Sequence, residues 1–440
     1  MLPLIAIVVV AFVLSFFLAC GLGANDVSNA FATSVGAKVL RLRTAFIIAS
    51  IAEMAGSVCL GGLVTEKIIR ATLTPGVLTP EEMIYAMLAS LISVTFWLAF
   101  ATYLKLPVSA THAVIAAMIG AGMIANSSAV CWSLLSHMAL AWVLAPVISG
   151  AFSSLAYVLL KRFILNRKDP FTVGLKSIPY IYALTIGVNL SMIGYQLNYK
   201  LALSFSVFLL LVGTIFVLII STLLIARLIV VPWTKSIIDS RKQLNPKDSP
   251  IAPSGDDVEQ LFSILQILSA IFTSFSHGSN DISNSVGPLF GLLNAYLMAN
   301  GRPMMTSDSP ALYGLLTFGS IGMIVGLFTW GARVIETLGT KLTASINPSK
   351  GFSIELGSAI TVLGASIAGL SVSTTHCKVG AIVALGLNES HQSPVNKLSN
   401  PPKPVNWRLI GDICASWICT IPCAGLLSAG CYFCLSTFIP

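Results

Sequence analysis

The sequence predicts an all-α polytopic membrane protein, and its composition and segment lengths carry that prediction. Of the 440 residues, 55% are hydrophobic and only 10% are charged. Apolar stretches such as 44–64, 202–231 and 408–436 are long enough as helices to cross a hydrocarbon core of about 30 Å. The chain starts with an apolar segment that lacks the basic region of a cleaved signal peptide, so we expect residues 3–20 to be a retained span.

About twelve apolar elements follow one another along the chain, and we expect all of them to cross the membrane. The alternate connecting segments on one side hold 19 Lys and Arg residues, whereas those on the other side hold four. Because cytoplasmic loops carry the basic excess, we expect both termini to be extracellular, loop 232–258 to be cytoplasmic and the protein to lie in the plasma membrane. This orientation accounts for the net charge of +8, and no basic stripe with interleaved aromatic residues indicates nucleic-acid binding. The elements are 3–36, 44–64, 84–104, 107–126, 133–160, 177–195, 202–231, 260–290, 310–330, 352–371, 373–389 and 408–436.

Two sequence motifs occur once in each half of the chain. GANDVSNAFATSVG at 23–36 and HGSNDISNSVGP at 277–288 align Gly, Asn, Asp, Ser and Asn with a single offset of 255 residues. PVSATH at 107–112 resembles SVSTTH, which ends at His376, with an offset of 264 residues. An internal duplication explains both matches.

The duplication predicts the organisation of the chain. A fainter match of ASIAEMAG at 49–56 with GSIGMIVG at 319–326 supports it. The element before Asp26 enters from outside and the element before Asp281 enters from the cytoplasm, so we expect two inverted repeats. Such repeats are typical of secondary transporters, which form their substrate sites from broken helices near the bilayer midplane. We expect a first repeat over 1–164, two connecting transmembrane helices over 165–231, a short solvated cytoplasmic loop over 232–258 and a second repeat over 259–440.

The repeated motif brings a carboxylate to membrane depth. A charged Asp near the centre of a membrane helix costs about 2.5 to 3.5 kcal/mol, so Asp26 and Asp281 need partners. No Arg or Lys occupies the same position in both motifs, which favours a bound cation over a permanent salt bridge. Asn25 and Asn29 are four residues apart and share a helix face beside Asp26. Their oxygens suit sodium, whereas a proton is the competing interpretation because burial disfavours a charged carboxylate.

Hydroxyl groups in the same motifs favour an anion next to the cation. Half-helix N-termini present unpaired N–H groups, which also attract anions. Two carboxylates alone would repel an anion, whereas bound cations would offset that repulsion and couple the two binding events, as in a symporter. The hydroxyl donors are Ser28, Ser283, Ser109, Thr111, Ser373 and Thr375.

Together, GANDVSNAFATSVG, HGSNDISNSVGP, PVSATH and SVSTTHCKVG resemble the inorganic phosphate transporter (PiT) family, whose sodium-driven members are the type III sodium-phosphate symporters. The resemblance covers both halves of the chain. It implies a secondary active transporter with twelve membrane elements and inverted repeats, inorganic phosphate as substrate and sodium as coupling ion. No other cofactor is implied, and a homodimer in the lipid bilayer is compatible with the sequence.

The resemblance also assigns roles to individual positions. Sodium ligands are expected at Asp26, Asn29, Asp281 and Asn284. Phosphate contacts are expected at Asn25, Asn280, Ser28, Ser283, Ser109, Thr111, Ser373, Thr374 and Thr375. Glu355 matches an acidic position of the family and Glu53 resembles its first-half counterpart, so both are candidates for coupling, together with His112 and His376.

Each assignment has a competing interpretation. The motif residues can cap and pack helices, the Ser and Thr hydroxyls can bond back to their own helices, and the histidines can pack between helices. Among functions, proton-coupled symport is the first alternative, followed by a passive channel or sensor. An intramembrane aspartic protease is a further alternative, although the two Asp contexts are too alike for it. CxxC spacing in the last span does not indicate a metal site, because Cys414 and Cys434 would lie about 30 Å apart along a helix.

Overall fold

The computed structural model describes residues 2–244, 255–336, 342, 346–368, 370, 372–390 and 405–438. Within the helices, the side chains of a few residues, including Ser28, lie outside this description. In the described ranges the regular structure is helical, apart from an isolated bridge between Leu73 and Val130 and a bridge residue at Val405. The prediction of an all-α protein is confirmed.

The first half of the chain contains α1 (Leu2–Leu22), the π-helical η1 (Gly23–Val27), α2 (Ser28–Gly36), α3 (Leu42–Thr72), α4 (Pro80–Tyr103), α5 (Ala110–Ala125), η2 (Ser127–Ala129), α6 (Trp132–Leu160) and η3 (Lys161–Leu165). The connecting region contains α7 (Pro170–Leu201), α8 (Phe205–Ile225), η4 (Ala226–Val230) and α9 (Val231–Leu244). The second half contains α10 (Gly255–Leu261), α11 (Ser263–Ala299), α12 (Pro310–Glu336), α13 (Pro348–Ile367), α14 (Thr374–Ser390) and α15 (Trp407–Phe438). Segment 232–258, expected as a solvated loop, is therefore helical at both ends.

Local chemistry explains where several helices begin. The Thr79 hydroxyl accepts a hydrogen bond from the backbone N–H of Glu82, and the Glu82 carboxylate accepts one from the N–H of Thr79. This capping box, with Pro80 in the first turn, starts α4. Asp169 starts α7 in a similar way, because its carboxylate accepts the N–H of Thr172 at 3.1 Å.

Nine helical segments in the described chain are long and apolar enough to cross a membrane. Helix α8 has no buried residue although it is almost entirely apolar, which suits contact with lipid tails rather than with water. The protein is thus an integral membrane protein, as predicted. The count of twelve crossing elements stays a prediction.

Four of the expected elements pair into two helical hairpins, α4 with α5 and α13 with α14. Helices α5 and α14 have 16 and 17 residues and, at about 1.5 Å per residue, are shorter than a hydrocarbon core of about 30 Å. Each packs against the longer helix before it. The non-helical tips of the two hairpins meet inside the protein, as the site contacts below show.

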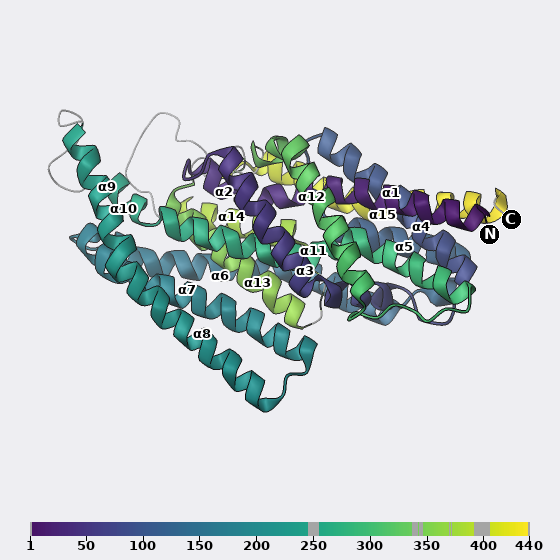
Figure 1. The fold of residues 1–440 in the computed structure, drawn as a ribbon. Coiled ribbons are helices and arrows are strands. Elements are labelled where there is room, and N and C mark those ends of the chain that lie inside the picture. The colour runs from purple at the N-terminus through teal and green to yellow at the C-terminus, as the bar shows by residue number, and fades with distance from the viewer. Residues whose placement is uncertain are drawn as a thin grey trace.

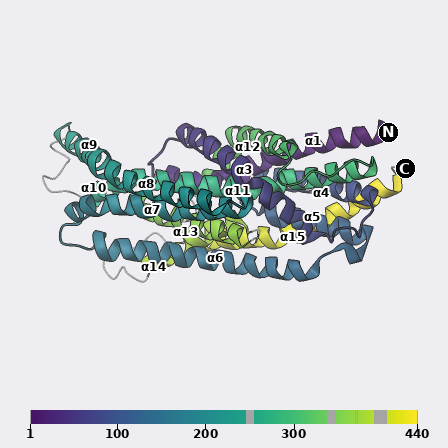
Figure 2. The same cartoon turned by 60° about the horizontal axis from the view of Figure 1, so that its bottom comes forward.

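The molecule is elongated, with both chain ends at one extremity and α9 and α10 at the other (Figure 1). Figure 2 shows the same arrangement from another side. Helix α11 lies in the middle and packs against α1, α3, α4, α12 and α13. Helices α7 and α8 pack against each other and extend away from this central group (Figure 1).

Glycines allow the same close helix contacts in both halves. A Cβ on Gly23 would lie 1.8 Å from the carbonyl oxygen of Met323, and a Cβ on Gly278 would lie 2.2 Å from that of Glu53. Gly23 and Gly278 are the repeated motif glycines, whereas Glu53 and Met323 align in the fainter repeat. Only glycine permits this backbone approach, because any side chain would overlap the carbonyl.

Candidate functional site

The two Asp-containing motifs lie side by side in the protein interior. The first spans η1 and the start of α2, and the second lies in the middle of α11. Asp26 and Asp281 are only 1% and 2% exposed. The break expected in these helices is present as a π-helical turn at Asp26, whereas α11 runs through Asp281 as a regular α-helix. The larger breaks lie in the hairpin tips.

The motif asparagines hold the hairpin tips. Asn25 donates to the carbonyl oxygen of Leu106 at 3.0 Å and to Thr102 at 3.2 Å, and its side-chain oxygen accepts the N–H of Val108 at 3.1 Å. In the second half, Asn280 donates to the carbonyl oxygen of Val372 at 3.0 Å. Both residues were expected to contact phosphate. Their described contacts instead position the loops that start α5 and α14.

Serine caps start the second helix of each hairpin. The hydroxyl oxygen of Ser109 accepts the N–H of His112 at 3.3 Å, and that of Ser373 accepts the N–H of His376 at 3.2 Å. Each hydroxyl keeps its own hydrogen for another acceptor. The two helix N-termini therefore present donors at the centre of the protein.

Hydrogen bonds cross from each Asp motif to the hairpin of the other half. Asn29 donates to the Thr375 hydroxyl at 2.9 Å, and Asn284 donates to the Thr111 hydroxyl at 3.1 Å. Thr375 in turn donates to Asp26 at 3.1 Å. Residues up to 349 positions apart are thus joined in one polar centre.

The surroundings of Asp281 differ from those of Asp26. Asp281 accepts hydrogen bonds from Asn280 at 2.7 Å and from Thr374 at 2.7 Å. His277 lies between two carboxylates, with Nε2 2.8 Å from Asp281 Oδ2 and Nδ1 2.9 Å from Glu53 Oε2. Ser274 donates to the same Glu53 carboxylate at 2.9 Å.

A second buried charge cluster lies next to this centre. Glu355 of α13 accepts hydrogen bonds from the Lys378 ammonium of α14 and the Thr33 hydroxyl of α2. Glu355 and Lys378 are 0% and 1% exposed. Glu53, expected as the first-half counterpart of Glu355, lies on α3 and pairs with His277, so the two glutamates have different partners. The position that aligns with Glu53 in the second half is Met323.

The two candidate histidines face each other between two tryptophans. The His112 and His376 rings are 4.6 Å apart, the His112 ring is 3.9 Å from the Trp142 ring, and the His376 ring is 3.6 Å from the Trp417 ring. Trp417 donates to the carbonyl oxygen of Pro107 in the first hairpin tip. The described contacts of both rings are packing contacts where the hairpins meet.

Ser283, one of the predicted hydroxyl donors, has its described hydrogen bond within its own helix. Ser283 donates to the carbonyl oxygen of Asn280 in its own helix at 2.6 Å, which is the helix back-bonding considered from the sequence. The side chain of Ser28 lies outside the described part of the chain. The other seven predicted phosphate residues all lie at the two hairpin tips or against them.

A cation-binding donor set remains at the centre. Ligand atoms of Asp26, His277 and Asp281 lie within 4.8 Å of one another. Among the described atoms, the buried side-chain oxygens of Asn29, Asn280 and Asn284 have no hydrogen-bond partner. Unpaired buried oxygens beside two carboxylates are the hard ligands that an alkali cation requires.

The free space at this centre is small. A cavity of about 10 Å³, enough for about one water molecule, reaches Asp26 and is lined by residues of α2, α11, α13 and α14. Phosphate does not fit this volume. The residues that line this central cavity are Asp26, Asn29, Ala30, Thr273, Ser276, His277, Ser358, Ala359, Val362, Thr374 and Lys378.

Comparison with known proteins shows the family to which this chain belongs. Residues 22–428 match the model of the phosphate transporter family. The chain belongs to the phosphate transporter family. It is 34% identical to a putative phosphate permease of Chlamydia muridarum over 94% of each chain. It is also 34% identical to the chloroplastic inorganic phosphate transporter 2-1 of Arabidopsis thaliana, covering 94% of this chain and 69% of that one.

A solved structure has the same fold. The sodium-dependent phosphate transporter superimposes with a TM-score of 0.81 at 30% identity, covering 99% of this chain and 100% of that chain. Membership of the phosphate transporter family confirms the predicted resemblance. It also establishes membrane transport of phosphate, rather than proteolysis or another enzymatic reaction, as the family's function.

Two buried ionisable residues of this candidate site had no predicted role. His277 was part of the quoted motif HGSNDISNSVGP but received no role, and Lys378 was noticed only as a basic residue inside an apolar element. In both cases the signal was present, since a buried ionisable side chain at membrane depth points to function. Their partners, Glu53 and Glu355, could not be paired with them from sequence spacing.

Proposed function

We propose that this protein is a sodium-coupled inorganic phosphate symporter that works by alternating access. The observation that carries the proposal is the donor set at the polar centre. Asp26 and Asp281 are buried close together, and three side-chain oxygens around them have no described hydrogen-bond partner. Two buried carboxylates this close repel each other, so a cation between them lowers the energy of the closed state.

Sodium fits the chemistry of these groups. In this proposal Asp26, Asp281, Asn29 and Asn284 hold sodium through oxygen atoms, and the cations offset the negative charge that would otherwise exclude phosphate. The structural similarity to a sodium-dependent phosphate transporter supports sodium as the coupling ion. A proton is the alternative, because protonation also removes the repulsion between carboxylates.

Phosphate is proposed to bind at the hairpin tips. The N-terminal turns of α5 and α14 meet there, and each presents backbone N–H groups and hydroxyls of the kind that bind oxyanions. Ser109, Thr111, Ser373, Thr374 and Thr375 supply the hydroxyl groups. Asn25 and Asn280 position the tips, so their effect on phosphate is exerted through the loops that they hold.

Inverted repeats are proposed to supply the alternating motion. The paired glycine contacts of Gly23 and Gly278, and the crossed bonds of Asn29 and Asn284, occur once in each half with matching partners. Two halves with equivalent contacts can exchange roles, one opening while the other closes. The positive-inside tendency supports a cytoplasmic extremity with α9 and α10 and both termini outside the cell.

Uptake of radiolabelled phosphate into proteoliposomes tests the proposal. The purified protein is given either an inward sodium gradient or an inward proton gradient, with excess sulfate as competitor. We expect concentrative uptake with the sodium gradient alone and no inhibition by sulfate. Uptake with the proton gradient alone would replace sodium by protons, and equilibration without concentration would indicate a channel.

A further inference from the structure

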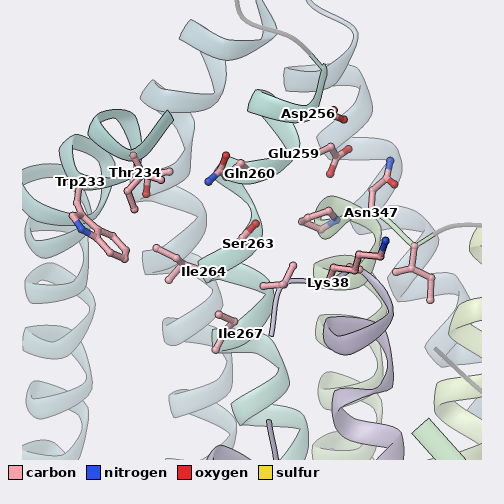
Figure 3. A pocket seen from close by; sticks show the side chains of 15 residues that line it. Lys38, Trp233, Thr234, Asp256, Glu259, Gln260, Ser263, Ile264, Ile267 and Asn347 are labelled. Atoms are coloured by element: carbon pink, nitrogen blue, oxygen red, sulfur yellow. The ribbon is translucent and has the colours of Figure 1, made fainter. Parts of the chain in front are cut away.

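A second, larger cavity opens at the extremity of the molecule that carries α9 and α10. It has a volume of about 640 Å³ and lies between α9, α10, the start of α11, the end of α2 and the start of α13 (Figure 3). Lys38, Asp256, Glu259 and Asn347 form its polar side, and Trp233 lies across from them (Figure 3). We call it the end vestibule.

Helix α2 runs from the end vestibule to the central cavity. Ala37, at the end of α2, lines the vestibule, and Ala30 lines the central cavity. Thr33 lies between them. Spacings of three and four residues place all three side chains on one face of the helix. Thr33 is fully buried and donates to Glu355.

Helix α13, like α2, has residues that line the end vestibule and residues that line the central cavity. Pro348 lines the vestibule, and Ser358 and Ala359 line the central cavity. Glu355 lies seven residues after Pro348 and three before Ser358, again on one helix face. The Glu355 carboxylate therefore lies along α13 between the two cavities.

Helix α11 completes the path. Ser263 and Ile267 line the vestibule, and Thr273 lines the central cavity. Gln266 lies at the level of the vestibule, between Ser263 and Ile267 along the helix. It is fully buried, and neither its side-chain nitrogen nor its oxygen has a hydrogen-bond partner among the described atoms. An unsatisfied buried amide on this track is available to a polar group that passes it.

Lys378 connects the central cavity with Glu355. Its side chain lines the central cavity, and its ammonium group donates to Glu355, which lies along α13 on the side of the end vestibule. A lysine here is a compact cation that can exchange one anionic partner for another. Inorganic phosphate is an oxyanion that would compete with the carboxylate for this group.

We propose that the Glu355–Lys378 ion pair is an anion-exchanging gate between the central cavity and the end vestibule. Phosphate displaces the Glu355 carboxylate from the Lys378 ammonium group as it passes, so Lys378 stays paired throughout. Glu355 keeps the Thr33 hydroxyl and turns toward the water of the vestibule. This inference rests on the proposed transport function, and it assigns to phosphate transport a buried cation that lies outside the two Asp motifs.

The closure of the gate is tested by thiol labelling. Ala359→Cys places a thiol in the central cavity, and a membrane-impermeant thiol reagent is applied to either face of oriented vesicles. The labelled peptide is identified by mass spectrometry, so the nine native cysteines stay in place. With Lys378→Gln or Glu355→Gln added, we expect labelling from the α9–α10 face to be about tenfold faster, because loss of a charge-assisted bond favours the open state.

The exchange of anions is tested with a charge swap. In the double variant Glu355→Lys/Lys378→Glu, an ion pair can form again, so labelling should return toward the parent rate. Phosphate uptake should stay low with a raised KM, because the cation no longer borders the central cavity. Lys378→Arg is the matched control and should keep much more uptake than Lys378→Gln.

Three results would overturn the gate. These are unchanged labelling in both single variants, faster labelling from both faces alike, and full recovery of phosphate KM in the swap, which would mean a purely structural pair. Absence of gradient-driven uptake in the parent protein would instead reject the proposed function. The labelling rates would still report the gate in that case, so the two failures are distinguishable.

Discussion

The two Asp half-sites carry the same motif in different surroundings. Around Asp281, a histidine lies between two carboxylates, His277 between Asp281 and Glu53. At the positions that align with His277 and Glu53, the half-site of Asp26 has Leu22 and Met323. Leu22 and Met323 are buried apolar side chains at 0% and 1% exposure. At these aligned positions, one half-site therefore has an imidazole and a carboxylate, and the other has two apolar side chains.

Two duplicated half-sites with different neighbours need not bind the coupling ion with equal affinity. Thr375 is the hydrogen-bond donor to Asp26 among the described side chains, whereas Asp281 has Asn280, Thr374 and His277 beside it. The π-helical turn at Asp26 adds to the contrast, since such turns are frequent at functional sites. We infer that Asp26 depends more strongly on an external cation.

Removing each carboxylate charge is expected to have the largest effect on sodium binding, and it tests whether the two half-sites differ. Asp26→Asn should weaken sodium binding by about 3 kcal/mol, roughly a 100-fold rise in half-saturating sodium, because a charged ligand is lost. Asp281→Asn should cost less, about tenfold, since its neighbours remain paired. Sodium titration of phosphate uptake measures both. Asp169→Asn, in an exposed helix cap, is the control, and equal effects at the two motif positions would remove the asymmetry.

Giving the second half-site the apolar residues of the first tests what the imidazole contributes. His277→Leu leaves Glu53 and Asp281 without their shared partner, and breaking such a buried pair costs about 3 to 5 kcal/mol of stability. The double variant His277→Leu/Glu53→Met reproduces the apolar pair Leu22 and Met323 and should recover most of that loss.

Thermal unfolding of the purified protein, with and without sodium, checks this expectation. The double variant should gain more stability from sodium than the parent does, because the carboxylate of Asp281 then lacks its imidazole neighbour. Lower stability in the double variant than in His277→Leu alone would contradict the account.

The glycine contacts test what the two halves share rather than how they differ. Gly23→Ala and Gly278→Ala should each destabilise the protein by about 1 to 3 kcal/mol, because the added methyl overlaps a backbone carbonyl. Gly213→Ala is the control, since no described atom lies within 4 Å of its added methyl. Unfolding temperatures measure all three, and a tolerated change at one motif glycine alone would show that the equivalent contacts do not carry equal strain.

The threonines that receive the crossed asparagine bonds should show the smallest difference. Thr375 accepts from Asn29 and also donates to Asp26, whereas Thr111 accepts from Asn284. Both changes should reduce sodium affinity. The reduction by Thr375→Val should exceed that by Thr111→Val by about 1 kcal/mol, or roughly fivefold. Initial uptake rates at low and saturating sodium give the comparison, and an effect of Thr111→Val that equals or exceeds it would count against the cation role of Asp26.

Long-range contacts limited what could be predicted about the site. The pairs Asn29–Thr375 and Asn284–Thr111 join motifs from different halves, and no spacing along the chain indicates that they cross. The contacts of Asn25 and Asn280 could not be predicted for the same reason, because their partners are backbone groups of the distant hairpin tips. The direct ligand roles expected for the motif residues stay predictions, and the described contacts of Asn25 and Asn280 position the hairpin tips.

The sequence by itself determined the solvent, the secondary structure and the motifs of this protein. Long apolar segments with few charges can satisfy their backbone in lipid only as helices, and a polar motif repeated at one offset marks a shared site. Only the tertiary structure decided which charges pair. Glu53 meets His277, and Glu355 meets Lys378, because helix packing sets these distances. The free energy of a buried charge depends on its neighbours in space, and sequence separation does not specify them.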